Sequence, residues 1–420
     1  MNTRNLLSPR TGGSGILIPA LALMTVSLST AFGQAFPDPG TEYEQHATSR
    51  LVESVQKRIN EGKTRFSHDG QYGYLADVLK AFGIPVSSQL LVFSKTSQFR
   101  DHINPENPRA VYFNDKVYVA WVPGTPYIEL AAVEPDVGSV FYILDQTLTE
   151  KPKFVRNNQC LECHTSVKNL GVPGPLVRSF PTDKKGAVNR LEGLSRVTHS
   201  TPLKYRWGGW YATGDTGAQM HLGNIVGKEE YSNRKKPKTV TNLSEFLDTS
   251  KYPGASSDVV SIMVLEHQAF MHNLITRLHL DSVTTLKRDG NINAIRDEAT
   301  AFLKYLLLVD EAPLKGAIKG NTDFADWFQN QGPRDTQGRS LRTLDLKTRL
   351  FKYPCSYLIY SDSFTQLHPF MKKHLFRRLH SILNGSDKSK DFAALDTQTR
   401  KDIKTILTAT LKDLPEFWDL

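Results

Sequence analysis

The pattern of hydrophobic and polar positions changes twice along this chain. Between residues 89 and 144, short apolar runs rich in Val, Ile, Tyr and Phe alternate with turn signals such as Asn114-Asp115 and Pro123-Gly124. Runs of this length and composition predict β-strands joined by tight turns. We therefore expect an antiparallel meander with strands at residues 89–93, 110–113, 117–122, 128–133 and 140–144.

Helical patterns lie on both sides of this block. Before it, residues 41–60 and 72–82 are expected to be helices, and Gly83-Ile84-Pro85 ends the second one. After residue 256, apolar side chains recur every three or four positions, which predicts helices. They are expected at residues 256–278, 294–308, 364–383 and 397–411. Residues 321–339 are predicted to be a surface connector, and residues 203–213 to be extended.

These elements predict an α+β protein in two parts. Residues 36–240 form an N-terminal part with the antiparallel β meander and a loop-rich region, and residues 256–420 form a mostly α-helical part. The boundary falls near residues 238–258. At 420 residues and 39% hydrophobic content, the chain is long enough to bury a substantial core in each part.

The first 35 residues resemble a secretory signal peptide. Arg4 and Arg10 precede an apolar run at residues 16–31, and small residues permit cleavage after Gly33 or Ala35. An uncleaved N-terminal anchor is the alternative. The segment predicts export, and hence a periplasmic protein.

Two of the three cysteines belong to a short motif, Cys160-Leu161-Glu162-Cys163-His164. The C-x-x-C-H spacing is the signature of covalent haem c attachment. The two thiols form thioethers with one porphyrin, and the adjacent imidazole of His164 binds the iron as its proximal ligand. At this composition about 0.0006 matches are expected by chance.

Two other chemistries use similar residues. A thioredoxin-like C-x-x-C requires a βαβ context near the motif. A structural zinc site requires a fourth ligand, most naturally another Cys or His at short spacing. The polar segment before the motif and the Gly- and Pro-rich segment after it, residues 167–175, favour haem. The third cysteine, Cys355, is expected to be a buried, unreactive thiol among aromatic residues.

The sixth coordination position of the iron determines what such a haem does. A Met or His there gives an electron-transfer site, whereas an open position permits ligand binding. The distal candidates are His221, which follows a Gly-rich loop, and His199 and His267; Met220 is a softer alternative. For each of them, an ordinary core or surface role is the alternative.

Other residues are candidates for lining the porphyrin. Arg206-Trp207-Gly208-Gly209-Trp210 combines an arginine with two indoles around a glycine pair. Arg206 and Arg178 are candidate partners of the propionates, and Trp207 and Trp210 are candidate walls. A turn with buried aromatic side chains is the competing interpretation.

The formal net charge is +9, and removing the signal peptide removes two arginines and leaves +7. Lys and Arg are dispersed, so a solvated basic surface is the simplest expectation. Such a surface favours an acidic redox partner protein or peripheral contact with an anionic membrane. Nucleic acid is not an expected partner of an exported haem protein.

The motif resembles that of monohaem c-type cytochromes. More broadly, the motif together with 206–211, 221–224, 266–268 and 353–357 resembles a group of large exported bacterial cytochrome c-like proteins. The β-rich block before the motif indicates that the fold is not that of a minimal class I cytochrome c. This resemblance implies haem and periplasm but no particular reaction. The expectation is periplasmic electron transfer. The alternatives are a haem enzyme acting on peroxide, a nitrogen oxide or a sulfur compound, and a haem-based sensor or binding module.

Overall fold

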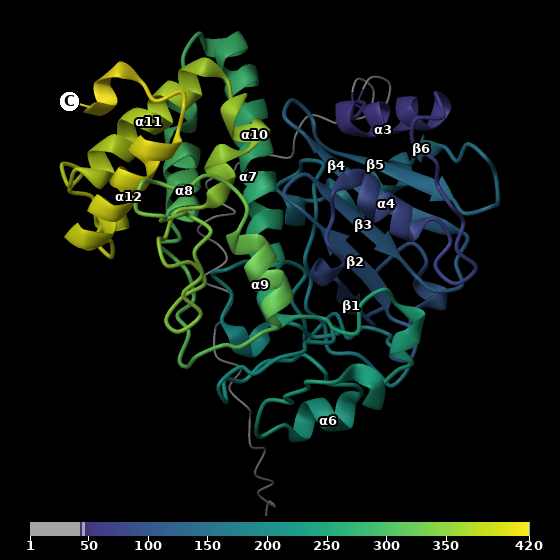
Figure 1. The fold of residues 1–420 in the computed structure, drawn as a ribbon. Coiled ribbons are helices and arrows are strands. Elements are labelled where there is room, and N and C mark those ends of the chain that lie inside the picture. The colour runs from purple at the N-terminus through teal and green to yellow at the C-terminus, as the bar shows by residue number, and fades with distance from the viewer. Residues whose placement is uncertain (1–42, 44–46, 420) are drawn as a thin grey trace, which may run out of the picture.

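A six-stranded antiparallel sheet forms the centre of the N-terminal part in the computed structural model, which describes residue 43 and residues 47–419. The predicted signal peptide lies outside the described residues. The strands follow one another in the sheet in chain order, so the predicted meander is confirmed (Figure 1). The strands are β1 Leu90–Val92, β2 Arg109–Phe113, β3 Val117–Trp121, β4 Tyr127–Glu134, β5 Gly138–Asp145 and β6 Phe154–Arg156. β6 was not predicted, because Phe154 and Val155 lie among charged and polar residues and form no longer apolar run.

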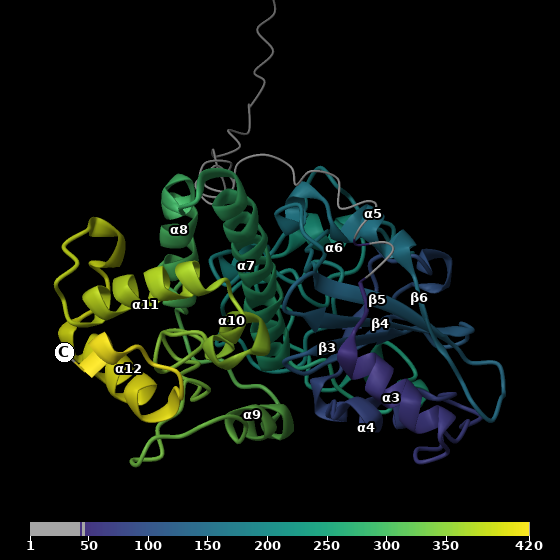
Figure 2. The same ribbon diagram turned by 90° about the horizontal axis from the view of Figure 1, so that it is seen from above.

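Alternate residues of these strands face opposite sides of the sheet. On one side, residues such as Leu91, Tyr112 and Val119 pack with two helices, α3 (Arg50–Asn60) and α4 (Leu75–Phe82). On the other side, Leu90 and Val111 belong to the core built on α7 (Val259–Asp289). Figure 2 shows α3 and α4 on one side of the sheet and the short helix α6 (Lys228–Asn233) on the other.

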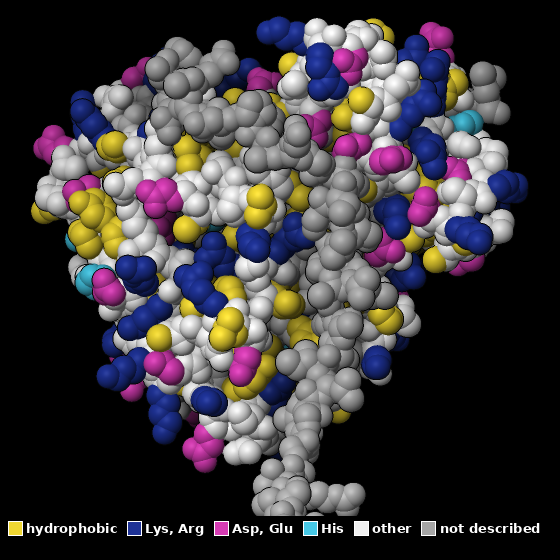
Figure 3. All heavy atoms as spheres, turned by 180° about the vertical axis from the view of Figure 1, so that it is seen from behind, with side chains coloured by type: hydrophobic (Ala, Val, Ile, Leu, Met, Phe, Trp, Pro, Cys, Tyr) yellow, Lys and Arg dark blue, Asp and Glu magenta, His cyan; other side chains and the backbone are white. Residues whose placement is uncertain are grey.

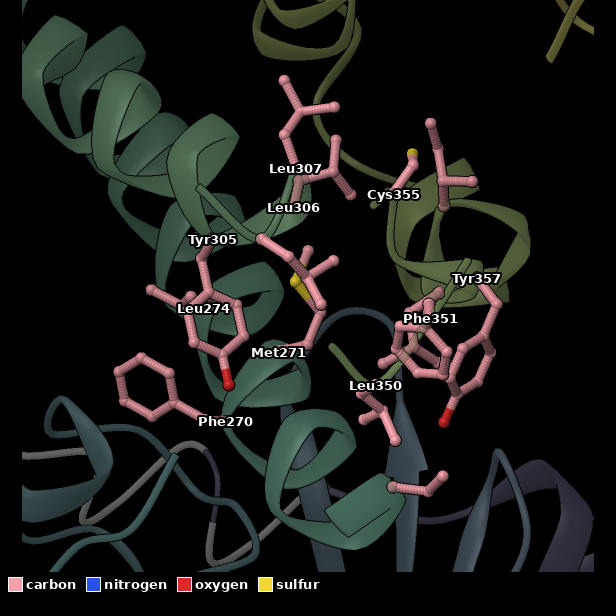
Figure 4. Packing of buried hydrophobic residues seen from close by; sticks show 14 of the residues in the cluster. Phe270, Met271, Leu274, Tyr305, Leu306, Leu307, Leu350, Phe351, Cys355 and Tyr357 are labelled. Atoms are coloured by element: carbon pink, nitrogen blue, oxygen red, sulfur yellow. The ribbon is translucent and has the colours of Figure 1, made fainter. Parts of the chain in front are cut away.

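The helix α7 organises the C-terminal part. The carboxylate of Asp258 accepts hydrogen bonds from the backbone N–H groups of Val260 and Ser261 at its start, and Gly290 in the left-handed conformation ends it. The residues from Val259 to Leu278 are buried all round the helix, which is typical of a helix enclosed by protein on every side. In Figure 4, Phe270, Met271 and Leu274 of α7 lie among residues from the end of α8 (Arg296–Leu306) and from the segment around Cys355.

Shorter helices surround α7. One of them, α9, lies in the segment predicted to be a surface connector, so that prediction was wrong: its Phe324 and Phe328 are buried in the core. The predicted helix at residues 364–383 is divided before Pro369, which cannot continue a helix from the preceding turn. The helices are α8 Arg296–Leu306, α9 Thr322–Gln329, α10 Asp362–Thr365, α11 Pro369–Leu383 and α12 Thr397–Thr410.

Between the sheet and α7 the chain is mostly irregular. Residues 165–258 contain one short helix, α6 (Lys228–Asn233), together with single 3₁₀ turns. Residues 203–213 begin with a 3₁₀ turn, Leu203–Tyr205, and contain no named strand, so the predicted extended segment was wrong. Trp210 makes only an isolated bridge to Val92 of β1.

One hydrophobic core crosses the predicted boundary between the two parts. The cluster that contains Met263 and Leu274 of α7 also contains Val92, Phe113 and Trp207 from the N-terminal part. The helical residues therefore share a core with one face of the sheet. None of the described helices is long and apolar enough to cross a membrane.

Candidate functional site

The C-x-x-C-H motif lies on a single helical turn directly after the edge strand β6. Asn157 caps the turn with its side-chain oxygen, which accepts from the backbone N–H of Gln159 at 3.2 Å. A 3₁₀ turn, Asn158–Cys160, then leads into α5 (Leu161–His164). Leu161 is buried against the core on the α3–α4 side of the sheet and holds the turn in place. Figure 2 shows α5 beside β5 and β6.

The two thiols of this turn are free. Cys160 is half-buried and Cys163 is exposed, and neither forms a disulfide. Cys160 directly precedes α5 with helical backbone angles, and Cys163 follows it by three residues, a spacing that places two side chains on one face of a helix. This arrangement suits two bonds to one flat molecule.

The imidazole of His164 is fixed by a backbone carbonyl. Its Nδ1 lies 2.8 Å from the carbonyl oxygen of Gly174, and the N–H of Gly174 donates to the carbonyl of His164 at 3.0 Å. A carbonyl oxygen only accepts, so Nδ1 carries the proton and the lone pair remains on Nε2. A histidine that binds a metal through one nitrogen commonly donates from the other in this way.

The loop that supplies this carbonyl is anchored on α7. Asn273 donates from Nδ2 to the carbonyl of Pro175 at 2.9 Å, and Arg277 donates from Nη1 to the carbonyl of Leu170 at 3.1 Å. Within the loop, Asn169 donates from Nδ2 to the carbonyls of both His164 and Gly174. The orientation of His164 therefore depends on the helical part of the molecule as well as on its own loop.

Burial and nearby cations set the protonation states of the motif. Burial lowers the pKa of His164 to about 4; the bond to Gly174 opposes this, and the charges of Arg178 and Arg109 add to it. The imidazole is therefore neutral at pH 7, the form that binds a metal. Burial also raises the pKa of the Cys160 thiol to about 12, with a further contribution from Glu129. Reactive dithiol sites instead have lowered thiol pKa values, so the thioredoxin-like alternative is disfavoured.

Two charged residues beneath the motif were not predicted from the sequence. Arg109 of β2 and Glu129 of β4 form an ion pair across the sheet, with Nη1 and Oε2 3.6 Å apart, and both side chains are largely buried. Burial raises the pKa of Glu129, and Arg109 opposes the shift. The sequence could have indicated this pair, because each residue is a charged residue inside an otherwise apolar strand. Burying such a charge destabilises the fold unless it is paired.

The predicted porphyrin-lining residues occupy two different places. Arg178 lies close enough to His164 to lower the pKa of its imidazole. The indole N–H of Trp210 donates to the carbonyl of Arg178 at 2.8 Å, so Trp210 fixes the backbone at that arginine. Trp207 and Arg206 instead belong to the buried region around α7.

Arg206 forms a buried ion pair with Glu266 of α7. Its Nη1 lies 2.9 Å from Oε2 of Glu266, and the two side chains are 3% and 0% exposed. Nε and Nη2 donate to the carbonyls of Thr201 and His199, each at 2.6 Å. Burial raises the pKa of Glu266 to about 7, opposed by Arg206 and by the Trp207 indole. The guanidinium is thus engaged within the core.

The distal candidates His199 and His267 contact each other. Their Nδ1 atoms lie 2.8 Å apart, so one ring donates to the other. Nε2 of His267 lies 2.8 Å from Oγ of Ser356, and His199 stacks on the ring of Tyr305 with centroids 3.9 Å apart. Burial lowers the pKa of both imidazoles, that of His267 to about 3. Both ring nitrogens of His267 are therefore already hydrogen-bonded.

The third distal candidate, His221, lies against Trp207. Their ring centroids are 5.0 Å apart, and Nδ1 of His221 accepts from the N–H of Gly223 at 3.1 Å. Burial lowers the pKa of this imidazole to about 4. In the part of the chain that the structure describes, no hydrogen bond, ion pair or ring contact joins His199, His221 or His267 to His164.

The donor set can also be compared with that of a zinc site. Among the described residues, no group of three or more His, Cys, Asp or Glu side chains converges as metal ligands do. A haem iron requires only one protein ligand from the motif, because the porphyrin supplies four nitrogens. The donor set at α5 therefore fits a haem better than it fits zinc.

Comparison with known proteins adds no further guide to the site. No protein-family model, curated protein or solved structure shows significant similarity to this chain.

Proposed function

We propose that this chain is an exported c-type cytochrome with one haem, attached through Cys160 and Cys163 and bound at its iron by His164. The observation that carries the proposal is the hydrogen bond from Nδ1 of His164 to the Gly174 carbonyl. It leaves the lone pair of Nε2 available to bind iron, on a residue that directly follows a free thiol, Cys163. The spacing of the motif and the predicted signal peptide support it independently. The bound haem would supply a one-electron iron couple.

The surrounding residues have separate roles in this proposal. Cys160 and Cys163 hold the porphyrin, and the ring of Phe141, whose centroid is 5.0 Å from that of His164, packs beside the proximal imidazole. Arg178 and Arg109 both act electrostatically on His164, and either guanidinium can pair with a propionate. Val155 and Val167, on either side of the motif in sequence, are 55% and 70% exposed; apolar surface of this kind suits contact with a porphyrin edge.

Electron transfer to a partner protein is the function that we favour. The chain is basic, with a formal net charge of +9 and predicted export, so we propose an acidic periplasmic redox partner. On the face shown in Figure 3, Lys and Arg side chains are spread widely with acidic side chains among them. Docking on such a surface is expected to be weak and dependent on salt. Peripheral contact with an anionic membrane is the alternative for the same charge.

The first experiment tests attachment. The full precursor is produced in a host with the c-type cytochrome maturation system, and haem is detected after denaturing electrophoresis and as a pyridine haemochrome. We expect retained haem in the wild type and loss of at least one thioether in Cys160→Ala and Cys163→Ala. Cys355→Ala is the matched control, because Cys355 is the third cysteine and is fully buried elsewhere; it should keep its haem. Colourless wild-type protein contradicts the proposal.

A second candidate function is a haem that binds small ligands, as an enzyme or a sensor does. The observation that favours it is that the predicted distal histidines are engaged elsewhere: His267 with His199 and Ser356, and His221 with Gly223. An iron without a sixth protein ligand binds carbon monoxide quickly when reduced. Rapid binding of carbon monoxide by the reduced protein therefore supports the second candidate, and failure to bind supports electron transfer.

A further inference from the structure

A cavity of about 250 Å³ lies where the β2–β3 turn, α7 and the start of α10 meet. It is distinct from the C-x-x-C-H turn, and none of the residues predicted from the sequence to bind haem lines it. It is lined by charged, polar and apolar residues that come from six separate segments. The lining includes Asp115, Lys116, Val133, His272, Pro333, Arg342, Tyr357, Leu358 and Asp362. Small-molecule sites are often found where structural units meet.

Arg342 is the best-positioned donor in this cavity. Its side chain is 5% exposed, and its guanidinium lies over the rings of Tyr357 and Phe328, 4.1 and 4.8 Å from their centroids. Nη2 pairs with Asp115, whereas Nε and Nη1 are buried without a hydrogen-bond partner. A planar guanidinium held on aromatic rings with donors to spare is the arrangement that recognises carboxylates.

His272 of α7 provides a second buried polar group. It is 2% exposed. Burial lowers the pKa of this imidazole to about 4, and a hydrogen bond to the backbone of Asp115 opposes the shift. The ring is thus neutral, and the nitrogen that does not face Asp115 is available as an acceptor. Buried polar groups of this kind are normally hydrogen-bonded, and a ligand can supply the missing bond.

The charges around the cavity are balanced in pairs. Lys116 lies 2.6 Å from Oδ2 of Asp362 at the mouth, and Arg342 pairs with Oδ2 of Asp115. Each carboxylate therefore uses one oxygen and has the other free to accept a further N–H group. A ligand with only a negative or only a positive charge would add an unbalanced charge to these neutral pairs. A zwitterion complements both signs at once.

The size and walls of the cavity limit the rest of the ligand. An engineered apolar cavity of about 150 Å³ holds one benzene ring, so about 250 Å³ holds a ring of that size together with a short polar head. Val133, Pro333, Leu358 and Tyr357 supply apolar and aromatic wall. A small molecule with one apolar or aromatic side chain fits this volume.

We propose that this cavity binds a free α-amino acid with an apolar or aromatic side chain. The carboxylate binds Arg342. The ammonium binds the free carboxylate oxygens of Asp115 and Asp362. The side chain lies against Val133, Leu358 and Pro333. The proposal does not depend on haem attachment.

The test is calorimetric titration of the full mature protein with L-phenylalanine. Two analogues that each lack one charged end, 3-phenylpropionate and phenethylamine, are the ligand controls. We expect saturable binding of L-phenylalanine and at least tenfold weaker binding of both analogues. Equal binding of 3-phenylpropionate would overturn the zwitterion assignment, and the absence of saturable binding by L-phenylalanine and by L-leucine would overturn the site.

Variants separate the site from adventitious binding. Arg342→Lys retains the charge but loses the planar fork, and it is expected to weaken binding at least tenfold. Because Arg342 is buried, the exposed variant Asp362→Asn is used in addition; it removes one of the two carboxylates that bind the ammonium, with an expected weakening of two- to fivefold. Glu61→Gln is its matched control, since Glu61 also forms an exposed ion pair, 2.7 Å from Lys63. Val133→Phe fills the cavity and should abolish binding. Unchanged affinity in Val133→Phe would overturn the proposal.

Discussion

Single residues determine how the imidazole of His164 is presented. Gly174 supplies its backbone oxygen to Nδ1 of His164, and its own Cα lies very close to α7. A Cβ at this position would lie 1.8 Å from Oδ1 of Asn273, a side chain that is itself hydrogen-bonded to Pro175. Only glycine fits there. The close approach makes this position a sensitive test of the site.

We therefore expect Gly174→Ala to move the loop away from α7. The expected loss is about 1–3 kcal/mol of unfolding free energy, the usual cost of inserting a methyl group into a packed region, measured by urea denaturation. With the proposed haem attached, the same variant should also change its absorbance spectrum, because the orientation of His164 changes. Gly70→Ala is the control, since a Cβ at Gly70 meets nothing within 4 Å. Equal stability of the two variants would contradict this account of Gly174.

At the scale of elements, one carboxylate joins the starts of two helices. Asp258 caps α7 by accepting from Val260 and Ser261 through Oδ1, and its Oδ2 accepts from the N–H of Asn321, the residue that caps α9. Burial raises the pKa of Asp258 to about 6, and these backbone hydrogen bonds oppose the shift. The contact explains how α9 is held against the beginning of α7.

Asp258→Ala is expected to lower the unfolding free energy by about 2 kcal/mol or more. The change removes an N-cap, which alone is worth about 0.5–2 kcal/mol, and leaves buried N–H groups without partners. Asp258→Asn should recover part of the loss, because its amide oxygen still accepts. Asp396→Ala, at the exposed N-cap of α12, is the control and should cost less. If the two alanine variants lost the same stability in urea denaturation, the joining role of Asp258 would be excluded.

At the scale of the whole molecule, the buried core contains imidazoles that are neutral when folded. Burial lowers the pKa of His164, His221 and His272 to about 4 and that of His267 to about 3, and it lowers that of His199 as well. Each such group binds a proton in the unfolded chain at a higher pH than in the folded one. The contribution of each buried neutral imidazole to the free energy of unfolding is therefore complete above pH 6.5, and it is lost as the pH falls towards 4.

His221→Gln tests this contribution at one position. Gln does not titrate, so the stability advantage of the wild type over the variant should shrink as the pH falls from 6.5 to 4, by about 1.4 kcal/mol per pH unit. Urea denaturation at pH 7.5, 5.5 and 4.5 measures the difference. His102→Gln, at an exposed histidine, is the surface control and is measured under the same conditions. A constant difference for His221→Gln would show that this imidazole titrates normally in the folded protein.

The sequence alone determined the local features of this protein. Alternating Val, Ile, Tyr and Phe runs with turn signals predicted five of the six strands and their meander, because hairpin pairing is decided by neighbours in the chain. Helical periodicity predicted α7, α8 and α12. The spacing of Cys160, Cys163 and His164 predicted a haem site within five residues, which stays a prediction. The burial of Cys355 was also predicted and is confirmed.

Only the tertiary structure decided which distant residues meet. It pairs Arg206 with Glu266 and His199 with His267, and it brings Arg109 and Arg178 within electrostatic range of His164. It also places α9 in the core, where Phe324 and Phe328 are buried. The physical reason is that these contacts join residues far apart in the chain, so they depend on how α7 packs against the sheet, and no local pattern records that packing.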